Sequence, residues 1–398
     1  MKKEIWIHID SYRPNSNAPA NRAFAFANYL SKKGFKINII TIGKEDAVEE
    51  RDEATVFYLK DSFHFKEKNL INRFLDNLVF SRKTLILLKK KKKNIKDTFF
   101  IVSIPEYIAG VSCIKAKKYG AKLIADFRDI WPEVAIEMGI FGPNSIKAKI
   151  FKYYANRYYK ESDYILTVSK RKTDYLSKII TKYKDKKVFW IGNGFDADTA
   201  TLKSDFSVLS GIDTSNKCII SYVGNVGKAQ HLKTLIDYSM AAKTSLNKLF
   251  IIAGTGGELK TLMKYTNDNN IKNVVFTGPV TKEQAKAIVC ASKIAFVPLS
   301  SDKMLDSVPT KMFEAIGLGT PVLLVAKGEA EDILKESKFG VSIWPSKVDE
   351  LELAFESLEK EYPTIMSNKS FAMELMKTKY SRQKYCADFE KILLEDIG

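Results

Sequence analysis

Charged residues of both signs gather around one predicted helix near residue 310. Asp306 and Glu314 are separated by seven residues, and Lys311 stands three positions before Glu314. Pro309 suits the first turn of a helix and Gly317 suits its end, so Lys311 and Glu314 share one helix face. This spacing could bring two acids and a cation to one site, or it could be a helix with a Lys–Glu pair on its surface. Composition does not decide between the two interpretations.

Two glycine-rich turns follow predicted buried strands in the second half of the chain. The run Gly224-Asn225-Val226-Gly227-Lys228 ends one strand, and an apolar helical pattern follows it over 232–236. Backbone amides at a helix start, with Lys228 beside them, suit a diphosphate. Residues 249–257 repeat the pattern, with Gly254 and Gly256 in the turn. A strand that leads through a glycine turn into a helix is ordinary in α/β domains, so each signal is weak alone.

The sequence disfavours several other chemistries. The loop Asp10–Asn21 has no glycine, so it lacks the Gly-x-Gly-x-x-Gly turn of a nicotinamide dehydrogenase, and no P-loop motif occurs. The four cysteines form no Cys-x-x-Cys pair. Asp196-Ala197-Asp198 lies in a predicted linker, where loop and capping chemistry is favoured over a metal site, so we predict no metal. We expect the three histidines, His8, His64 and His231, to be structural.

The elements that position these residues follow from an alternation of short apolar runs and helical patterns. Ile5–Ile9, a helix over Asn21–Lys33, and Ile37–Ile42 form a β-α-β unit, which is typical of a parallel sheet with helices on both faces. The polar stretch Asp196–Lys217 is predicted to link two such domains, and Tyr380–Leu394 is predicted to be a last amphipathic helix. The other predicted strands are Phe99–Ser103, Leu123–Asp126, Tyr164–Val168, Val188–Ile191, Cys218–Val223, Leu249–Ala253, Asn273–Phe276, Ile294–Pro298 and Pro321–Val325.

Length and composition predict a folded protein of two α/β domains. The 398 residues are 45% hydrophobic and 28% charged. No stretch approaches the roughly 18 apolar residues of a membrane-spanning helix, and no signal peptide is recognised, so we expect a cytoplasmic protein. The 64 lysines and arginines exceed the 47 acids, which gives a formal charge of +17. This excess favours an anionic partner, although a surface rich in lysine throughout would explain it equally well.

The segment Leu70–Lys96 combines an apolar helix with a basic cluster. Apolar residues recur at helical spacing up to Val79, and eight basic side chains follow between Arg82 and Lys96. This combination favours an anionic membrane surface, and an internal helix with a solvated lysine run is the alternative. A nucleic-acid binder could use the same lysines. The run lacks interleaved aromatic residues and known nucleic-acid signatures, so we expect no nucleic acid.

Several segments taken in order carry a family resemblance: Gly224–Lys228, Ala253–Gly257, Pro309–Val322, Gly328-Glu329, Asp126–Glu133, Glu161–Ser169 and Asn193–Asp196. The chain resembles the retaining glycosyltransferases of family 4, or glycosyltransferase group 1. Their GT-B fold is α/β, with two Rossmann-like doubly wound domains that face each other across a cleft. Residues 126–133 resemble the Asp-x-Arg-Asp-x-Trp-Pro-Glu segment of a branch that builds bacterial surface polysaccharides and includes N-acetylfucosamine transferases.

The resemblance implies a donor site in the second domain. It implies that Glu314 holds the ribose hydroxyls and that Asp306, where the family usually has glutamate, faces the donor sugar and the reacting centre. Lys228 maps onto a lysine that contacts donor phosphates. Asn225 replaces a common arginine, and Lys311 is our candidate for the missing cation. The predicted donor-binding residues are Gly224, Asn225, Gly227, Lys228, Gly254, Gly256, Ser307, Lys311 and Glu314, and the predicted catalytic residues are Asp306, Asp129 and Lys228.

A predicted acceptor site follows the strand at 123–126 in the first domain. Asp126, Arg128 and Asp129 are predicted to bind the acceptor, and Asp129 could orient its hydroxyl. The alternative is that Asp129 caps a helix or pairs with Arg128. The resemblance implies transfer with retention, in which the leaving phosphate can take the acceptor's proton, so that no dedicated base is required. Fixed amides and cations would stabilise the diphosphate as negative charge develops.

The implied function is transfer of a sugar, with an N-acetylated deoxysugar as the branch-level expectation. The donor would be a UDP-sugar and the acceptor a polyprenyl-diphosphate-linked saccharide in capsule, O-antigen or related assembly. We expect no cofactor, no metal, and a place on the inner face of the cytoplasmic membrane. The predicted domains are 1–197 for the acceptor, 198–375 for the nucleotide-sugar, and 376–398 as a helix that crosses back. Alternatives are a GT-B nucleotide-sugar epimerase, a basic binding protein without catalysis, and a silent partner subunit.

Overall fold

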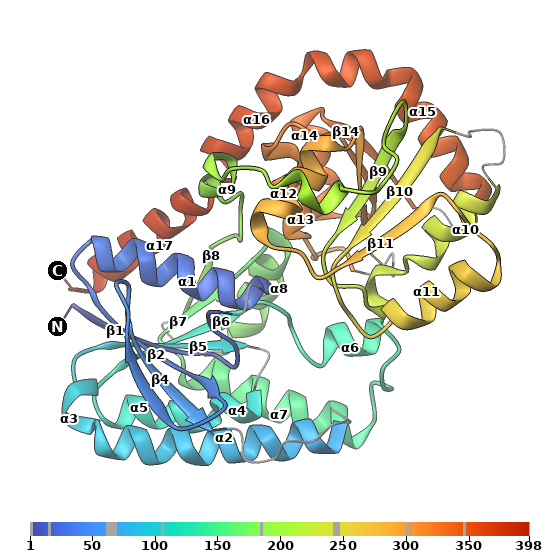
Figure 1. The fold of residues 1–398 in the computed structure, drawn as a ribbon. Coiled ribbons are helices and arrows are strands. Elements are labelled where there is room, and N and C mark those ends of the chain that lie inside the picture. The colour runs from blue at the N-terminus through green and yellow to red at the C-terminus, as the bar shows by residue number, and fades with distance from the viewer. Residues whose placement is uncertain are drawn as a thin grey trace. The chain divides into compact units, whose positions relative to one another are not determined.

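The chain folds into two compact units in a computed structural model (Figure 1). The first unit comprises Met1–Asn193 and Tyr385–Gly398, and the second comprises Gly194–Lys384. No helix in the described part of the chain is both long and apolar enough to cross a membrane. The structure describes residues 3–14, 17–60, 70–104, 107–183, 186–241, 247–299, 301, 304–344 and 348–397.

The first unit is built on an eight-stranded sheet with helices on both faces (Figure 1). Neighbouring strands are parallel except for one antiparallel pair at an edge, β3 with β4. The order of strands reverses between β1 and β5, and in doubly wound sheets ligands bind beside the carboxyl ends of the strands at this point. In sheet order the strands are β3 (Ala47–Glu50), β4 (Thr55–Lys60), β2 (Lys36–Gly43), β1 (Glu4–His8), β5 (Phe99–Ile104), β6 (Lys122–Phe127), β7 (Tyr164–Thr167) and β8 (Lys187–Trp190).

The central strands are buried on both faces, as the continuous apolar runs of a parallel sheet require. Trp6 of β1 stacks between Phe57 and Phe100, with ring centroids 5.4 and 6.4 Å away, and these contacts fix the register of three strands. The predicted strands of this half are confirmed with small shifts at their ends, whereas β3 and β4 were not predicted. The helices of the unit are α1 (Ala18–Lys32), α2 (Leu70–Lys90), α3 (Lys92–Ile95), α4 (Tyr107–Gly110), the 3₁₀ turn η1 (Val111–Cys113), α5 (Ile114–Lys118), α6 (Glu133–Glu137), α7 (Ile146–Glu161) and α8 (Lys170–Ile180).

Helix α1 begins before the predicted start at Asn21, which is therefore wrong. The side chain of Asn17 caps the helix by accepting a hydrogen bond from the amide of Ala20 at 2.9 Å. Pro19 lies in the first turn, where a missing N–H costs nothing. On its buried face, Phe26 packs against Phe389 of α17 (Arg382–Ile397) with ring centroids 4.8 Å apart. Residues from Tyr385 onward thereby complete the core of the first unit.

The second unit carries a six-stranded sheet in which all described pairs are parallel. The order reverses between β9 and β12, so the carboxyl ends of these strands flank its switch point. The five predicted strands are confirmed, and β14 was not predicted. In sheet order the strands are β11 (Val274–Gly278), β10 (Lys248–Ala253), β9 (Cys218–Val223), β12 (Ile294–Pro298), β13 (Val322–Val325) and β14 (Gly340–Ile343).

The predicted linker Asp196–Lys217 belongs to the second unit, because the boundary between the units lies earlier, between Asn193 and Gly194. The segment contains short helices. The second boundary lies between Lys384 and Tyr385, so both differ from the predicted ends at residues 197 and 375. The binding roles assigned to the two domains stay predictions. The helices of the second unit are α9 (Ala197–Thr201), η2 (Phe206–Leu209), η3 (Lys228–Gln230), α10 (Lys233–Ala241), α11 (Leu259–Asp268), α12 (Lys282–Ala291), α13 (Thr310–Gly317), α14 (Glu329–Ser337), α15 (Val348–Ser367) and α16 (Lys369–Thr378).

Candidate functional site

The two predicted glycine turns pack directly against each other at the switch point of the second sheet. A Cβ atom on Gly254 would lie 1.9 Å from the carbonyl oxygen of Gly224, and one on Gly256 would lie 2.1 Å from that of Val226. No side chain fits at these distances, so both glycines are needed for the contact between the loops that follow β9 and β10. This contact places the turn at 224–228 beside the carboxyl end of β9.

Three backbone amides of the turn at 224–228 are already occupied. The amide of Gly224 donates to Ala253 at 2.9 Å, and that of Val226 donates to Thr255 at 2.8 Å. The amide of Gly227 donates to the Gln230 side chain at 3.2 Å. The turn leads into η3, and α10 begins only at Lys233. The helix predicted over 232–236 is confirmed as α10, with the 3₁₀ turn η3 before it. Because three amides of the turn are occupied, an anion here would depend more on cations than on amides.

Lys311 of α13 lies beside Gly224. Its Nζ donates a hydrogen bond to the Tyr222 hydroxyl at 2.7 Å and stands 4.1 Å from the centre of the Tyr222 ring. The same hydroxyl donates to the carbonyl of Asn225 at 2.5 Å, so Tyr222 connects Lys311 to the turn. Burial lowers the pKa of Lys311 to about 7. Sequence reasoning missed Tyr222, because a tyrosine in a buried strand carries no signal of such a contact.

The remaining predicted donor residues surround α13 and the turn. Lys228 and Asn225 are exposed on the turn itself. Glu314 is half-buried one helical turn after Lys311, and its carboxylate has no hydrogen bond or ion pair with any residue that the structure describes. Burial raises the pKa of Glu314, and the nearby charge of Arg382 opposes this rise. Within the described part of the chain, the nearby charges that act on this carboxylate include those of Arg382, Lys282 and Lys311.

Asp306 and Ser307 lie in the loop before α13, and both are half-buried. The start of α14 anchors this loop. The amide of Glu329 donates to the carbonyl of Leu305 at 2.9 Å, and a Cβ atom on Gly328 would lie 2.2 Å from that oxygen. Gly328 adopts a φ of 79°, which favours glycine. The Gly328-Glu329 motif thus holds the chain that carries Asp306.

In the first unit, Asp126 is the next-to-last residue of β6 and is buried in an ion pair. Its two oxygens accept hydrogen bonds from Nε and Nη2 of Arg22, both at 2.8 Å, and both side chains are 5% exposed. Arg22 also donates from Nη1 to the carbonyl of Gly192 at 3.2 Å and to the Asn193 side chain at 3.3 Å. Arg22 of α1 therefore connects Asp126 to the segment that contains Gly192 and Asn193. The partner was not predicted, because Arg22 is far away in the sequence.

Arg128 and Asp129 follow β6 and are half-buried. The amide of Arg128 continues the sheet by donating to Ile104 at 3.2 Å. Within the described ranges, the Asp129 carboxylate has no hydrogen bond or ion pair, and α6 is capped by Pro132. Neither alternative role for Asp129, helix capping or pairing with Arg128, is found there.

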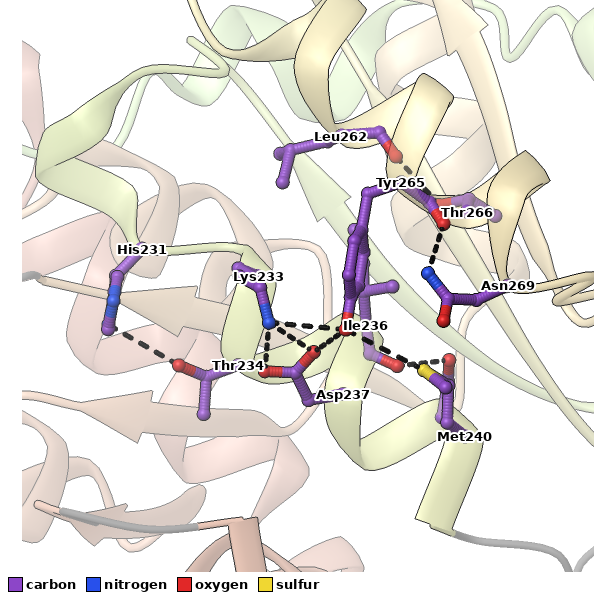
Figure 2. Close-up of polar contacts among 11 residues, drawn as sticks. His231, Lys233, Thr234, Ile236, Asp237, Met240, Leu262, Tyr265, Thr266 and Asn269 are labelled. Atoms are coloured by element: carbon purple, nitrogen blue, oxygen red, sulfur yellow. Dashed lines mark hydrogen bonds and ion pairs between the residues drawn. The ribbon is translucent and has the colours of Figure 1, made fainter.

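The described histidines have structural contacts. His8 is 1% exposed, stacks on Phe80 at 4.6 Å and contacts the Thr84 hydroxyl at 3.2 Å, and burial lowers its pKa to about 3. His231 contacts the Thr234 hydroxyl at 3.3 Å (Figure 2). His64 lies outside the described residues.

A network next to His231 fixes α10 against α11, as Figure 2 shows. Lys233 pairs with Asp237 at 2.8 Å and donates to the hydroxyl of Tyr265 at 3.2 Å. Tyr265 donates in turn to Asp237 at 2.9 Å. All three polar groups satisfy one another, so the network supports the helix that follows the glycine turn and is not a candidate site.

Asp196 does not stand free as a metal ligand, because its carboxylate pairs with Arg382 at 2.8 Å. Among the described residues, no group of three His, Cys, Asp or Glu side chains is arranged to hold a metal. Metal independence of the reaction stays a prediction.

Helices α2 and α7 lie on the same side of the first sheet (Figure 1). Each of them carries exposed apolar and exposed basic side chains. On α2 the aliphatic residues Leu75, Leu78 and Ile86 are 37%, 41% and 47% exposed. On α7, Ile146 and Tyr153 are 77% and 63% exposed. We call this surface the α2–α7 face. Its residues are Leu75, Leu78, Arg82, Ile86, Lys89, Lys90, Ile146, Lys149, Ile150, Tyr153, Arg157 and Lys160.

Residues 210–373, which lie within the second unit, match the family model of glycosyl transferases group 1. An uncharacterized glycosyltransferase of Methanocaldococcus jannaschii is 21% identical over 248 residues, which are 59% of this chain. The match spans 60% of that relative's length. The predicted glycosyltransferase is supported at this level, and the family 4 branch stays a prediction.

Solved structures share the fold of the whole chain. The sucrose-phosphate synthase of Thermosynechococcus elongatus is similar with a TM-score of 0.80 and 12% identity, over 99% of both chains. Anabaena HepE in complex with UDP-glucose has a TM-score of 0.72 and 13% identity, over 98% of this chain and 99% of its own. WaaG, a glycosyltransferase involved in lipopolysaccharide biosynthesis, has a TM-score of 0.73 and 13% identity, over 97% and 99%. The predicted GT-B fold is confirmed.

Proposed function

We propose that this protein is a retaining glycosyltransferase that uses a UDP-sugar. The observation that carries the proposal is the arrangement of Lys311, Glu314 and the Gly224 turn at the switch point of the second sheet. HepE, which has the same fold, was solved with UDP-glucose. A cation beside a glycine turn suits the diphosphate. The Glu314 carboxylate, one helical turn away and without an ion pair in the described ranges, suits the ribose hydroxyls.

The chemistry that we propose needs stabilisation of the leaving diphosphate more than it needs a base. As the bond between the sugar and the diphosphate breaks, negative charge grows on the phosphates, and fixed cations such as Lys311 and Lys228 stabilise it. Asp306 faces the sugar, and the departing phosphate takes the proton of the acceptor hydroxyl. Asp129 orients that hydroxyl. The oxygens of Asp126 already accept hydrogen bonds from Arg22, so in this proposal Asp126 helps to hold the end of β6 that leads to Asp129.

The acceptor that we propose is a saccharide linked to a polyprenyl diphosphate, as in the assembly of bacterial surface polysaccharides. The α2–α7 face supports this proposal, because it combines exposed aliphatic side chains with arginines and lysines. Such a surface suits the anionic inner leaflet of a membrane. A groove of about 500 Å³ beside α2, lined in part by Val48, Phe57 and Ile86, adds apolar surface next to it. The sequence prediction of a membrane surface covered Leu70–Lys96 and did not include α7.

Thermal unfolding in the presence of nucleotides tests the donor. We expect UDP or a UDP-sugar, without metal, to stabilise the protein by about 2.7 kcal/mol at a hundred times its dissociation constant. GDP and ADP, compared at the same concentrations, should give smaller shifts. A UDP-sugar that is converted without any acceptor would favour the epimerase, and stabilisation by no nucleotide would contradict the proposal.

Binding to liposomes tests the α2–α7 face. We expect the protein to bind vesicles that contain phosphatidylglycerol and not vesicles of phosphatidylcholine. Each lysine near an anionic surface contributes about 1 kcal/mol, so Lys89→Gln/Lys90→Gln should weaken binding roughly tenfold or more. The matched control is Lys260→Gln/Lys264→Gln, which removes two exposed lysines from α11 of the second unit. Equal losses in both variants would mean that net charge alone, and not this face, is responsible.

A further inference from the structure

We infer that Tyr222 is a positioning residue of the donor site, which holds the Lys311 ammonium at the Gly224 turn as the cation for the donor's diphosphate. The inference rests on the proposed function. It adds Tyr222, a residue that no sequence motif selects. It also explains how the site keeps a cation although Asn225 stands where the family that the sequence resembles commonly has arginine: Lys311 supplies the charge. Three observations carry it: the placement of Lys311, the double contact of Tyr222, and the lack of space at Gly224.

The position of Lys311 disfavours the charged form of its side chain. It is the second residue of α13, and the positive end of the helix dipole disfavours a cation in the first turn. Its side chain is half-buried, and among the described residues no carboxylate lies within ion-pair distance of it. The charged and titratable groups that face it there are Glu314 on its own helix and Tyr222 on β9. An ammonium in such a place is most stable when an anion arrives.

Tyr222 holds both sides of the arrangement. Its ring is 0% exposed, and burial raises the pKa of its hydroxyl, so the hydroxyl stays protonated. It accepts from Lys311 at 2.7 Å and donates to the carbonyl of Asn225 at 2.5 Å. One rigid side chain therefore couples the position of the cation to the shape of the turn.

The ammonium of Lys311 lies so close to Gly224 that a side chain at position 224 would crowd it. A Cβ atom there would lie 3.1 Å from Nζ of Lys311. The amide of Gly224 donates to Ala253 at the end of β10, and that of Val226 donates to Thr255 in the following loop, so neither is available to phosphates. In this part of the site, the charge that meets the diphosphate comes from Lys311, with Lys228 on the exposed side of the turn.

Calorimetric titration with UDP and with uridine tests the inference. Hydrogen bonds to charged groups contribute about 1.5–3 kcal/mol, so we expect Lys311→Met to weaken UDP binding about 10- to 100-fold, and Tyr222→Phe about tenfold. Uridine, which has no phosphates, should bind all variants equally. The matched control is Tyr238→Phe. It removes another buried phenol that accepts from a lysine, Lys248, at 2.9 Å in the same unit, and it should leave UDP binding unchanged.

The pH profile separates this role from a merely structural one. Because burial lowers the pKa of Lys311 to about 7, the ammonium is present below pH 7 and is lost as the pH rises. Phosphates are fully charged above their second pKa of about 6. UDP affinity of the wild type should therefore fall between pH 7 and 9, by up to about tenfold per unit, and that of Lys311→Met should stay flat.

Three results would overturn the inference. If UDP binds Lys311→Met or Tyr222→Phe as tightly as the wild type, the inference fails while the donor site stands. If uridine and UDP lose affinity in parallel, Tyr222 supports the fold and does not position the cation. If the wild type binds no UDP at any pH, the proposed function itself fails, and the inference fails with it.

Discussion

Glu314→Gln should weaken UDP binding about 10- to 100-fold and leave the folded protein intact. The carboxylate is half-buried and has no hydrogen bond or ion pair with any described residue, so the substitution breaks no such contact and removes only the longer-range attraction to Arg382 and Lys311. If it holds two ribose hydroxyls, the charged hydrogen bonds that are lost contribute about 1.5–3 kcal/mol. Calorimetry with UDP measures the loss directly, and circular dichroism checks the fold.

The pH dependence gives the same prediction a second readout. Burial raises the pKa of Glu314, so the ionised form that accepts hydrogen bonds is present above that pKa and is lost as the pH falls. As the pH is lowered, the affinity of the wild type for uridine should therefore begin to fall at a pH higher than that at which an ordinary glutamate is protonated. The affinity of Glu314→Gln should not change. Glu359→Gln, which removes an acid that pairs with Lys248 at 3.1 Å, is the matched control. Equal effects of the two substitutions would contradict a role for Glu314 in binding ribose.

Arg22→Met, which removes the cation of the buried pair with Asp126, should strongly lower the free energy of unfolding of the first unit. It leaves a carboxylate 5% exposed without its cation, and breaking a buried pair from one side costs about 3–5 kcal/mol. It also removes the hydrogen bonds to Gly192 and Asn193. Chemical denaturation, followed by the fluorescence of tryptophans in the first unit, measures the loss.

A double variant distinguishes a buried charge from lost packing. Arg22→Met/Asp126→Leu removes both charges and should be more stable than Arg22→Met alone, because no unpaired carboxylate remains. Lys264→Met breaks an exposed pair with Asp268, at 75% and 56% exposure, and should cost less than about 1 kcal/mol. If Arg22→Met costs no more than this control, the ion pair does not hold the first unit together.

The fold could be predicted largely because parallel strands are apolar on both faces and stand out as short runs. Cys218–Val223 and Ile294–Pro298 were predicted with the bounds that the structure has. The strands that were missed lie near sheet edges, where burial is incomplete. β3 is exposed along its whole length, and β14 is half-buried. These two strands have no buried apolar run that a sequence pattern can detect. β4 does contain an apolar run, at Val56–Leu59, and was missed for another reason that the structure does not explain.

The sequence motifs selected several residues of the candidate site, but they did not predict the contacts that these residues make. Gly254 and Gly256 were selected as donor-binding residues, and the structure places them where one loop backbone meets another. Lys311 was selected as a cation, whereas Tyr222 could be found only once β9 and α13 were placed side by side. Asp126 was selected without Arg22. Each omission is a contact between residues far apart in the sequence, which local patterns do not encode.

The first unit is not continuous in the chain, since residues 385–398 belong to it and the whole second unit is inserted before them. On the ribosome, the first 193 residues would emerge well before Phe389 and Glu390, the residues that cover Phe26 and bond Tyr29. At roughly 5–20 residues per second, the delay is on the order of 10–40 s. During that time the outer face of α1 is uncovered, so a nascent chain of this protein exposes apolar surface until its last helix is made. Synthesis of the second domain therefore sets the time at which the first can finish folding.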